Sequence, residues 1–256
     1  MGKVLIFLAL WSWNAFGTYN RTQYLPPKSF RLNPKNEDLS KAKLVNGFAV
    51  LATRPFSQKD LPICVRWKAD DSQVKIAVEK AILIWNDAAQ KTLRASLFTF
   101  DCKGAPGIEV ALSGESGNPE DGTIKFGEVF FSEDARPLLL LRKKELQEYS
   151  EMLSQLGQMQ VEKRALEGEQ KASFEKNFAS FRRAKVEKML LQIVTHELGH
   201  TLGLGHNFNP EELSIMDYSD RTELSAYDLD SLRWLFQGKA HGSWKPMLQP
   251  AARTTR

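Results

Sequence analysis

Three of the four histidines in the chain fall within eleven residues, in the segment HELGHTLGLGH at positions 196 to 206. On a helix, His196 and His200 lie four residues apart and therefore share one face, with their Cβ atoms about 5–6 Å apart. Two imidazole nitrogens at this separation can reach one Zn²⁺ ion at about 2.0–2.1 Å. The spacing therefore predicts a metal site on a helix.

Two glycines separate the second histidine from the third. Gly203 and Gly205 can adopt positive φ angles, so they can end the helix and let His206 approach the metal from another direction. Three protein nitrogens leave a fourth position open, which is typical of a catalytic zinc site and not of a closed structural one. Glu197 is rotated around the helix from the first histidine, and we predict that it acts as the general base toward a metal-activated water.

The segment HELGHTLGLGH resembles the zinc-binding signature of the metzincin metallopeptidases, and its wording is matrixin-like. Residues 214–218, SIMDY, look like the tight Met-turn of this family and follow the third histidine by a short loop. The resemblance implies that one catalytic Zn²⁺ is held by His196, His200 and His206. It also implies that Met216 forms a hydrophobic floor under the site and is not a ligand.

Tyr218 stands two positions after Met216, and this Met-x-Tyr spacing looks like the astacin and serralysin groups, where such a tyrosine can approach the zinc. By this resemblance, Tyr218 is a candidate to bind the metal reversibly or to hydrogen-bond the reaction oxyanion. The alternative is an ordinary packed aromatic side chain.

The elements that must position these residues are predicted from periodicity. A helix over residues 186–202 carries the histidines, and a second helix over 225–236 follows the Met-turn segment, with Ser225 and Asp228 at capping-box spacing. Upstream we expect a helix over residues 73–93 and strands over 61–67, 95–100, 108–112 and 123–132, the last as one bent strand or two short ones.

The resemblance covers residues 61–133 and 186–236, and it implies an α+β fold of the metzincin type: a mixed twisted sheet, an active-site helix, the Met-turn and a C-terminal helix. We further expect the segment 123–132 to offer a sheet edge at which an extended substrate adds as a strand.

Residues 134–185 have a different composition, because Gly and Pro are sparse and Glu, Lys, Gln, Arg and Leu dominate. Apolar residues recur here at spacings of three and four, which predicts a helical insertion in the form of a hairpin with a break at Gly168. We expect the insertion to pack on its own domain and to rim the cleft. A contact with a membrane or a partner is the alternative.

The amino terminus predicts export. Residues 1–17 have one lysine, a short apolar run and small residues at the end, which is the build of a secretory signal peptide; an uncleaved anchor or a buried helix is the alternative. The protein is thus expected in a secreted, periplasmic or other extracellular location. Export would place Cys64 and Cys102 where disulfides persist, and pairing is favoured over two buried thiols.

We divide the remaining chain into an N-terminal arm or short pro-segment at 18–60, a catalytic domain at 61–236 and a loose tail at 237–256. The formal net charge of +4 over 256 residues excludes a strongly basic nucleic-acid binder, and no stretch after the signal peptide is apolar and long enough to span a bilayer. The sequence therefore predicts a secreted zinc endopeptidase that acts on proteins or peptides. A catalytically silent zinc-binding module that acts through protein contacts is the alternative, and Ca²⁺ in the loop 113–122 is left open.

Overall fold

The computed structural model describes residues 56–68, 71–104, 107–113, 126–131, 137–204, 213–216 and 221–237. The predicted signal peptide, nearly all of the predicted N-terminal arm and the predicted tail after residue 237 lie outside the described residues. Within the described ranges, no helix has both the length and the apolar character that a bilayer span requires.

The body of the molecule is built on a mixed sheet, which among the described residues has five strands in the order β2-β1-β3-β5-β4. The strands are β1 (Ile63–Trp67), β2 (Phe98–Thr99), β3 (Gly107–Ser113), β4 (Gly127–Phe131) and β5 (Pro137–Arg142). Neighbouring strands run parallel except β4, which pairs antiparallel with β5 and occupies the edge of the sheet. The antiparallel edge strand lies where the sequence analysis expected a substrate-binding edge.

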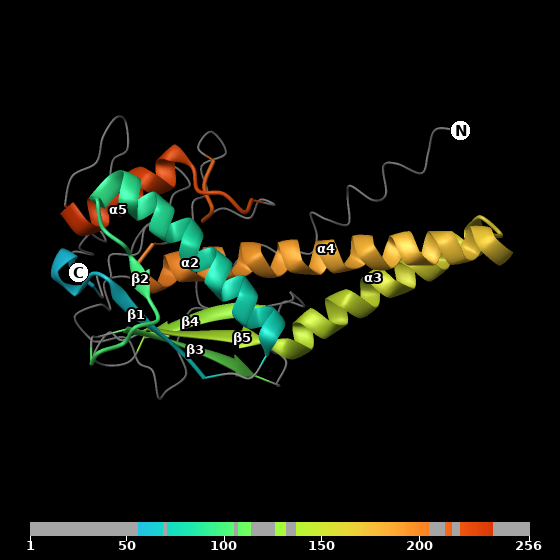
Figure 1. Ribbon diagram of the computed structural model, residues 1–256, viewed down its shortest axis with the longest axis horizontal. Coiled ribbons are helices and arrows are strands. Elements are labelled where there is room, and N and C mark those ends of the chain that lie inside the picture. Colours follow the sequence, from blue (N-terminus) through green and yellow to red (C-terminus); the bar gives the residue numbers. More distant parts are fainter. Residues whose placement is uncertain are drawn as a thin grey trace, which may run out of the picture.

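The helices α2 (Ser72–Leu93) and α4 (Gly168–Thr201) pack on one side of this sheet, and α5 (Ala226–Gln237) packs on α2 (Figure 1). The α2 helix begins at Asp71, whose carboxylate accepts the backbone N–H groups of Gln73 and Val74, as an N-cap does. Trp85 of α2 is fully buried and donates its Nε1–H to the carbonyl of Thr195 in α4 at 2.9 Å. This contact fixes α2 against the helix that carries the histidines.

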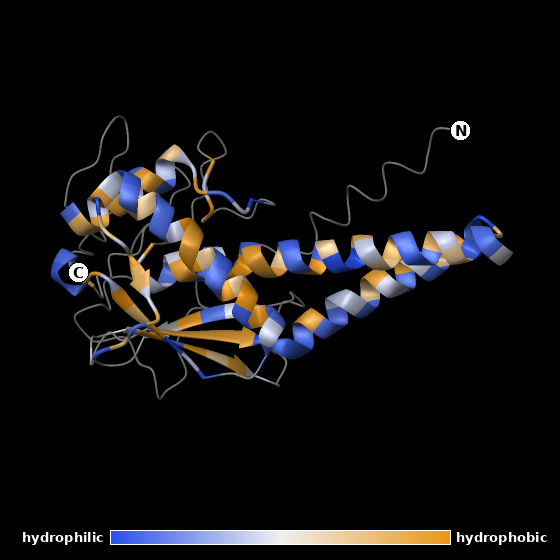
Figure 2. Ribbon diagram, viewed as in Figure 1, coloured by the Kyte–Doolittle hydropathy of each residue, from blue (hydrophilic) through white to orange (hydrophobic). Residues whose placement is uncertain are grey.

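The arrangement confirms the predicted mixed sheet with a site helix and a C-terminal helix. The strands are mostly apolar, and Figure 2 shows the hydrophobic residues concentrated in the sheet and on the helix faces near it. The core contains side chains of β1, β3, β5, α2, α4 and α5. The helix that carries the histidines, α4, is therefore held by the sheet on one side and by α2 on another.

The arm consists of α3 (Lys143–Lys163) and the first half of α4, and it projects from the body as an antiparallel helix pair (Figure 1). The prediction of a helical insertion over 134–185 was wrong for residues 137–142, which form strand β5 between β3 and β4. A run of four leucines fits a buried strand as well as a helix. Here alternate residues Pro137, Leu139 and Leu141 are buried, which is the period of a strand.

The predicted boundary at residue 186 is also wrong, because α4 is one continuous helix of 34 residues. No Gly or Pro occurs between Glu169 and Leu198, so nothing in the sequence interrupts the helix. The break predicted at Gly168 does separate the two helices, and Gly168 itself has a φ of +54°. The second helix of the arm and the helix with the histidines are thus the same element.

A disulfide joins Cys64 of β1 to Cys102, just beyond β2, with a Cα–Cα distance of 5.2 Å. Parallel pairing of Cys64 with Thr99 brings the two segments together. Cys64 is fully buried.

Reduction of this disulfide is expected to lower the free energy of unfolding by about 3–4 kcal/mol, because the bond closes a loop between residues 38 apart in sequence. Chemical denaturation with and without a reductant measures the change. The variant Cys102→Ser is the control, since it should match the reduced wild type and ignore the reductant. A wild-type midpoint that does not respond to reductant contradicts the prediction.

Candidate zinc site

The last two turns of α4 carry His196, Glu197 and His200. A Cβ atom at Gly199 would overlap the sulfur of Met216 and would lie 3.2 Å from the ring of Trp85, so only glycine allows the helix to pack this closely. The α-helix ends at Thr201, and Gly203 follows with a φ of +97°, a left-handed conformation that glycine adopts without strain. The chain leaves the helix where the sequence analysis expected a turn.

The two histidine rings of α4 lie together, with centroids 4.7 Å apart and ring planes at 87°. The Nδ1 of His196 is 2.8 Å from the carbonyl oxygen of Ile215, and the Nδ1 of His200 is 2.7 Å from that of Leu204. Because a carbonyl can only accept, each Nδ1 carries the proton, and the lone pair of the neutral ring is on Nε2. This is the tautomer that a histidine ligand uses when a backbone oxygen orients it.

Electrostatics also favour a neutral ring at His200. Burial lowers the pKa of His200 to about 3, and the neighbouring His196 acts in the same direction. Near neutral pH, His200 therefore offers an uncharged nitrogen, as metal coordination requires.

Glu197 is buried beside the histidines and packs against Gly127 of the edge strand β4. A Cβ at Gly127 would lie 2.8 Å from the Cγ of Glu197, so the missing side chain makes room for the carboxylate. Burial raises the pKa of Glu197 to about 8; the charge of Glu128 adds to this and that of Arg142 opposes it. The Oε2 atom of Glu197 is buried and has no hydrogen-bond partner among the described residues, which is unusual unless a ligand completes the site.

Met216 lies in the turn beneath the histidines and is buried. The turn is held by Asp228 of α5, whose carboxylate accepts the Ser214 hydroxyl and the Ile215 N–H, the latter at 2.9 Å. The same carboxylate accepts the N–H of Ser225 at 2.8 Å, which completes the predicted capping box of α5. Burial raises the pKa of Asp228, although these hydrogen bonds favour its charged form.

The sequence analysis did not assign Asp228 to the site, but only to the cap of α5. The structure gives it a second role, because Asp228 fixes the backbone of Ile215, and the carbonyl of Ile215 orients His196. The sequence signal that could have indicated this second role was the position of a capping residue shortly after the predicted Met-turn. The close-packing roles of Gly127 and Gly199 were also missed, because a glycine in sequence does not reveal what lies opposite it.

The structure thus brings together His196, Glu197, His200 and Met216. His206 and Tyr218, as well as nearly all of the loop 113–122 considered for Ca²⁺, lie outside the described residues. Among the described residues, no group of three or more His, Cys, Asp or Glu side chains could hold a metal. The predicted site requires His206 as its third ligand.

The mixed sheet, the helix with the HExxH segment and the turn that buries Met216 are consistent with the metzincin-like fold that the sequence resembles. Residues 118–237 match the matrixin family model, so this part of the chain is matrixin-like. The match includes β4, β5, the arm, the site helix and α5, and it implies a zinc metallopeptidase. Comparisons with curated proteins and with solved structures give no match.

Replacing Asp228 with Ala is expected to lower the free energy of unfolding by roughly 3 kcal/mol, because it leaves buried N–H groups without an acceptor. It should also weaken zinc binding about tenfold, since the carbonyl that orients His196 is no longer fixed. Denaturant unfolding and competition with a chelator measure the two effects.

The matched control is Asp230→Ala on the same helix, which removes only a partly exposed ion pair with Arg233. It should change stability by less than about 1 kcal/mol and leave zinc affinity unchanged. Equal zinc affinities in both variants would contradict the role given to Asp228.

Proposed function

We propose that this chain is a secreted zinc-dependent endopeptidase in which His196, His200 and His206 hold the metal and Glu197 is the general base. One observation carries the proposal: a buried carboxylate, with one oxygen unpartnered among the described residues, lies beside two imidazoles whose Nδ1 atoms are fixed by backbone carbonyls. The matrixin match at residues 118–237 supports the same activity.

The donor set suits zinc. Two imidazoles at close range, each oriented by a carbonyl, are ligands that Zn²⁺ prefers, and the sequence supplies a third histidine, His206, six residues after His200. When bound, Zn²⁺ supplies Lewis acidity toward water and toward the scissile carbonyl.

Glu197 accepts a proton from the attacking water and passes it to the leaving amine. Its burial suits this task, because burial raises the pKa of Glu197 and so favours uptake of a proton, while a bound cation would oppose this shift and keep the carboxylate ionised before the proton is taken up. The packing of Cγ against Gly127 limits where the carboxylate can move, so its oxygens stay near the histidines. Tyr218 is proposed to hydrogen-bond the oxyanion.

The substrate is proposed to be a protein or peptide bound in extended form along β4. This strand is antiparallel and at the sheet edge, and its first residue, Gly127, touches Glu197. Main-chain hydrogen bonds to such an edge do not depend on the side chains of the substrate, and they would bring one of its peptide bonds to the Glu197 carboxylate. Secretion is proposed from the apolar segment within residues 1–17, and the Cys64–Cys102 disulfide supports an oxidising compartment.

Replacing Glu197 with Gln is expected to abolish hydrolysis of casein while zinc stays bound at one ion per chain, because the amide keeps the shape but accepts no proton. Zymography and metal analysis measure the two results. The control Glu187→Gln alters an exposed residue of the same helix and should leave activity unchanged. Hydrolysis retained by the Glu197 variant would reject Glu197 as the base.

Replacing His206 with Ala is expected to weaken zinc binding by at least about tenfold, since one of three protein ligands is lost. Replacement of His241, the fourth histidine of the chain, is the matched control and should have no effect. Wild-type protein that binds one zinc ion but hydrolyses neither casein nor gelatin would instead support the silent zinc-binding module.

A further inference from the structure

One side of α4 stays accessible to solvent from the arm to the site. Phe181, Lys185 and Lys188 are exposed, and Gln192 and His196 are partly exposed. Their spacings of four, three, four and four residues place them on one side of the helix. The neighbouring row of Val186, Leu190, Val194 and Leu198 is buried. We call the accessible series from Phe181 to Gln192 the α4 row, and it leads directly to His196.

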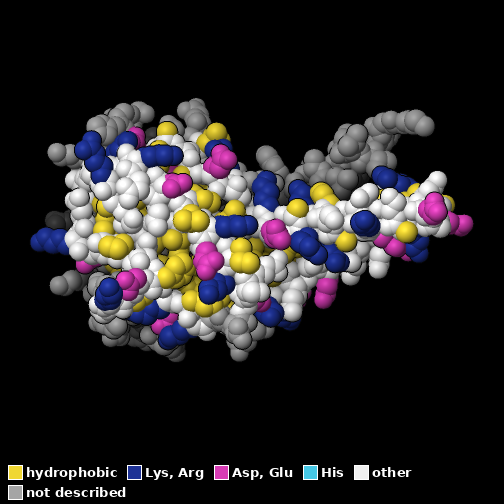
Figure 3. Space-filling model, in the orientation of Figure 1, with side chains coloured by type: hydrophobic (Ala, Val, Ile, Leu, Met, Phe, Trp, Pro, Cys, Tyr) yellow, Lys and Arg dark blue, Asp and Glu magenta, His cyan; other side chains and the backbone are white. Residues whose placement is uncertain are grey.

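The α4 row carries positive charge. Lys185 and Lys188 are the two basic side chains of the row, and the row contains no acidic residue. Dark blue side chains lie over the half of the arm next to the body in Figure 3. Within the described part of the chain, Lys185 and Lys188 form no ion pair, whereas Lys144 and Lys171 elsewhere on the arm pair with Glu148 and Glu175.

An aromatic side chain adjoins this charge. The Lys185 ammonium lies 5.6 Å from the centroid of the Phe181 ring, and Phe181 is 48% exposed. A cation held over an exposed ring can bind a carboxylate while the ring covers apolar atoms beside it. The chemistry of the α4 row therefore fits an acidic peptide segment that also contains apolar residues.

The distances suit a substrate already bound at the site. Lys185 precedes His196 by eleven residues, which is about 16–17 Å along a helix. An extended peptide covers this length with about five residues. In addition, Phe126, just before β4, packs edge-to-face on Tyr149 of α3 with centroids 6.1 Å apart. The base of the arm thus adjoins the start of the edge strand.

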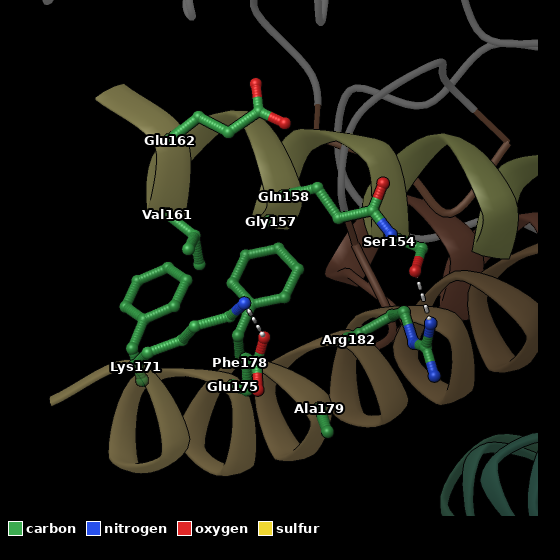
Figure 4. A pocket seen from close by; sticks show the side chains of 11 residues that line it. Ser154, Gly157, Gln158, Val161, Glu162, Lys171, Glu175, Phe178, Ala179 and Arg182 are labelled. Atoms are coloured by element: carbon green, nitrogen blue, oxygen red, sulfur yellow. Dashed lines mark hydrogen bonds and ion pairs between the residues drawn. The ribbon is translucent and has the colours of Figure 1, made fainter. Parts of the chain in front are cut away.

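The pocket farther out on the arm has different chemistry. It has a volume of about 450 Å³ and lies between α3 and α4 around Phe178 (Figure 4). Both of its basic side chains have partners, since Lys171 contacts Glu175 and Arg182 donates to the Ser154 hydroxyl at 2.9 Å. It therefore offers less for recognition of a charged ligand than the exposed lysines nearer to the site.

We infer that the α4 row is an exosite that binds an acidic segment of a protein substrate about five residues or more from the scissile bond. This inference rests on the proposed peptidase function. It predicts that charge on the arm contributes to binding of long acidic substrates and not to the chemical step.

The test compares the double variant Lys185→Glu/Lys188→Glu with the wild type. The first substrate is a short peptide that contains only the bond that the protein cleaves first in casein. Longer peptides extend this sequence on either side with Asp and Glu, and their matched controls carry Asn and Gln at the same positions. For a long acidic peptide, the double variant should have a kcat/KM about tenfold below that of the wild type, because its KM is higher. This difference should become smaller at high salt, which screens the charges. For the short peptide and the control peptides, kcat/KM should stay within about twofold.

The matched control is Lys176→Glu/Arg183→Glu, which makes the same charge change at exposed positions on the opposite side of α4. It should behave like the wild type on all peptides. Equal losses in the two double variants, or no loss in the first, would overturn the exosite.

Binding of a fluorescein-labelled peptide rich in Asp and Glu, followed by anisotropy, separates this inference from the proposed function because it needs no turnover. The full-length Glu197→Gln variant should bind this probe about tenfold more tightly than the same chain with Lys185→Glu/Lys188→Glu. Failure to cleave any peptide would count against the proposed function alone. Binding to anionic vesicles in place of the peptide would overturn the exosite in favour of a membrane contact.

Discussion

The hydrogen bond between the Nδ1–H of His196 and the carbonyl of Ile215 connects the two halves of the site. It can orient the ring only if the backbone of the turn is fixed, and that backbone is held by Asp228 at the start of α5. Since α5 itself packs on α2, the position of one imidazole depends on the packing of the C-terminal helix. The ring of His200 depends in a similar way on the carbonyl of Leu204, which lies just after the end of α4. The four hydrogen bonds that the Asp228 carboxylate accepts are therefore part of how the site is built.

A second constraint is close backbone approach at two glycines. Gly127 lets the Glu197 side chain lie against the edge strand, and Gly199 lets Met216 lie against the helix. The consequence is a carboxylate whose pKa burial raises to about 8 and whose Oε2 has no partner among the described residues. Such a group is unfavourable in a closed core. A cation beside it would compensate its charge, and any ligand that binds only the folded state also stabilises that state. The features that disfavour Glu197 as a structural residue are those that suit it to proton transfer.

Much of the fold and part of the site could be predicted from residue spacing. The four-residue separation of His196 and His200 fixes their common face, and the pairing of Ser225 with Asp228 marks the start of α5. The prediction for the leucine run 138–141 was wrong because a short apolar segment fits a helix and a buried strand equally well. Pairing with the neighbouring strands β3 and β4 determines that this segment is a strand. The second role of Asp228 and the contacts of the two glycines depend on atoms far away in sequence, which no local pattern contains. The predicted roles of His206 and Tyr218 stay predictions.

The continuity of α4 changes the meaning of the arm. Had residues 134–185 formed a separate insertion, its orientation toward the site would depend on a linker. Instead the backbone hydrogen bonds of one helix run from Gly168 to Thr201, so Lys185 and His196 keep a fixed separation and a fixed relative direction. Trp85 and the sheet hold the body end of that helix, and α3 packs along the outer end. A surface on such an element binds without first having to be ordered, so contacts made there contribute to affinity with little entropic cost.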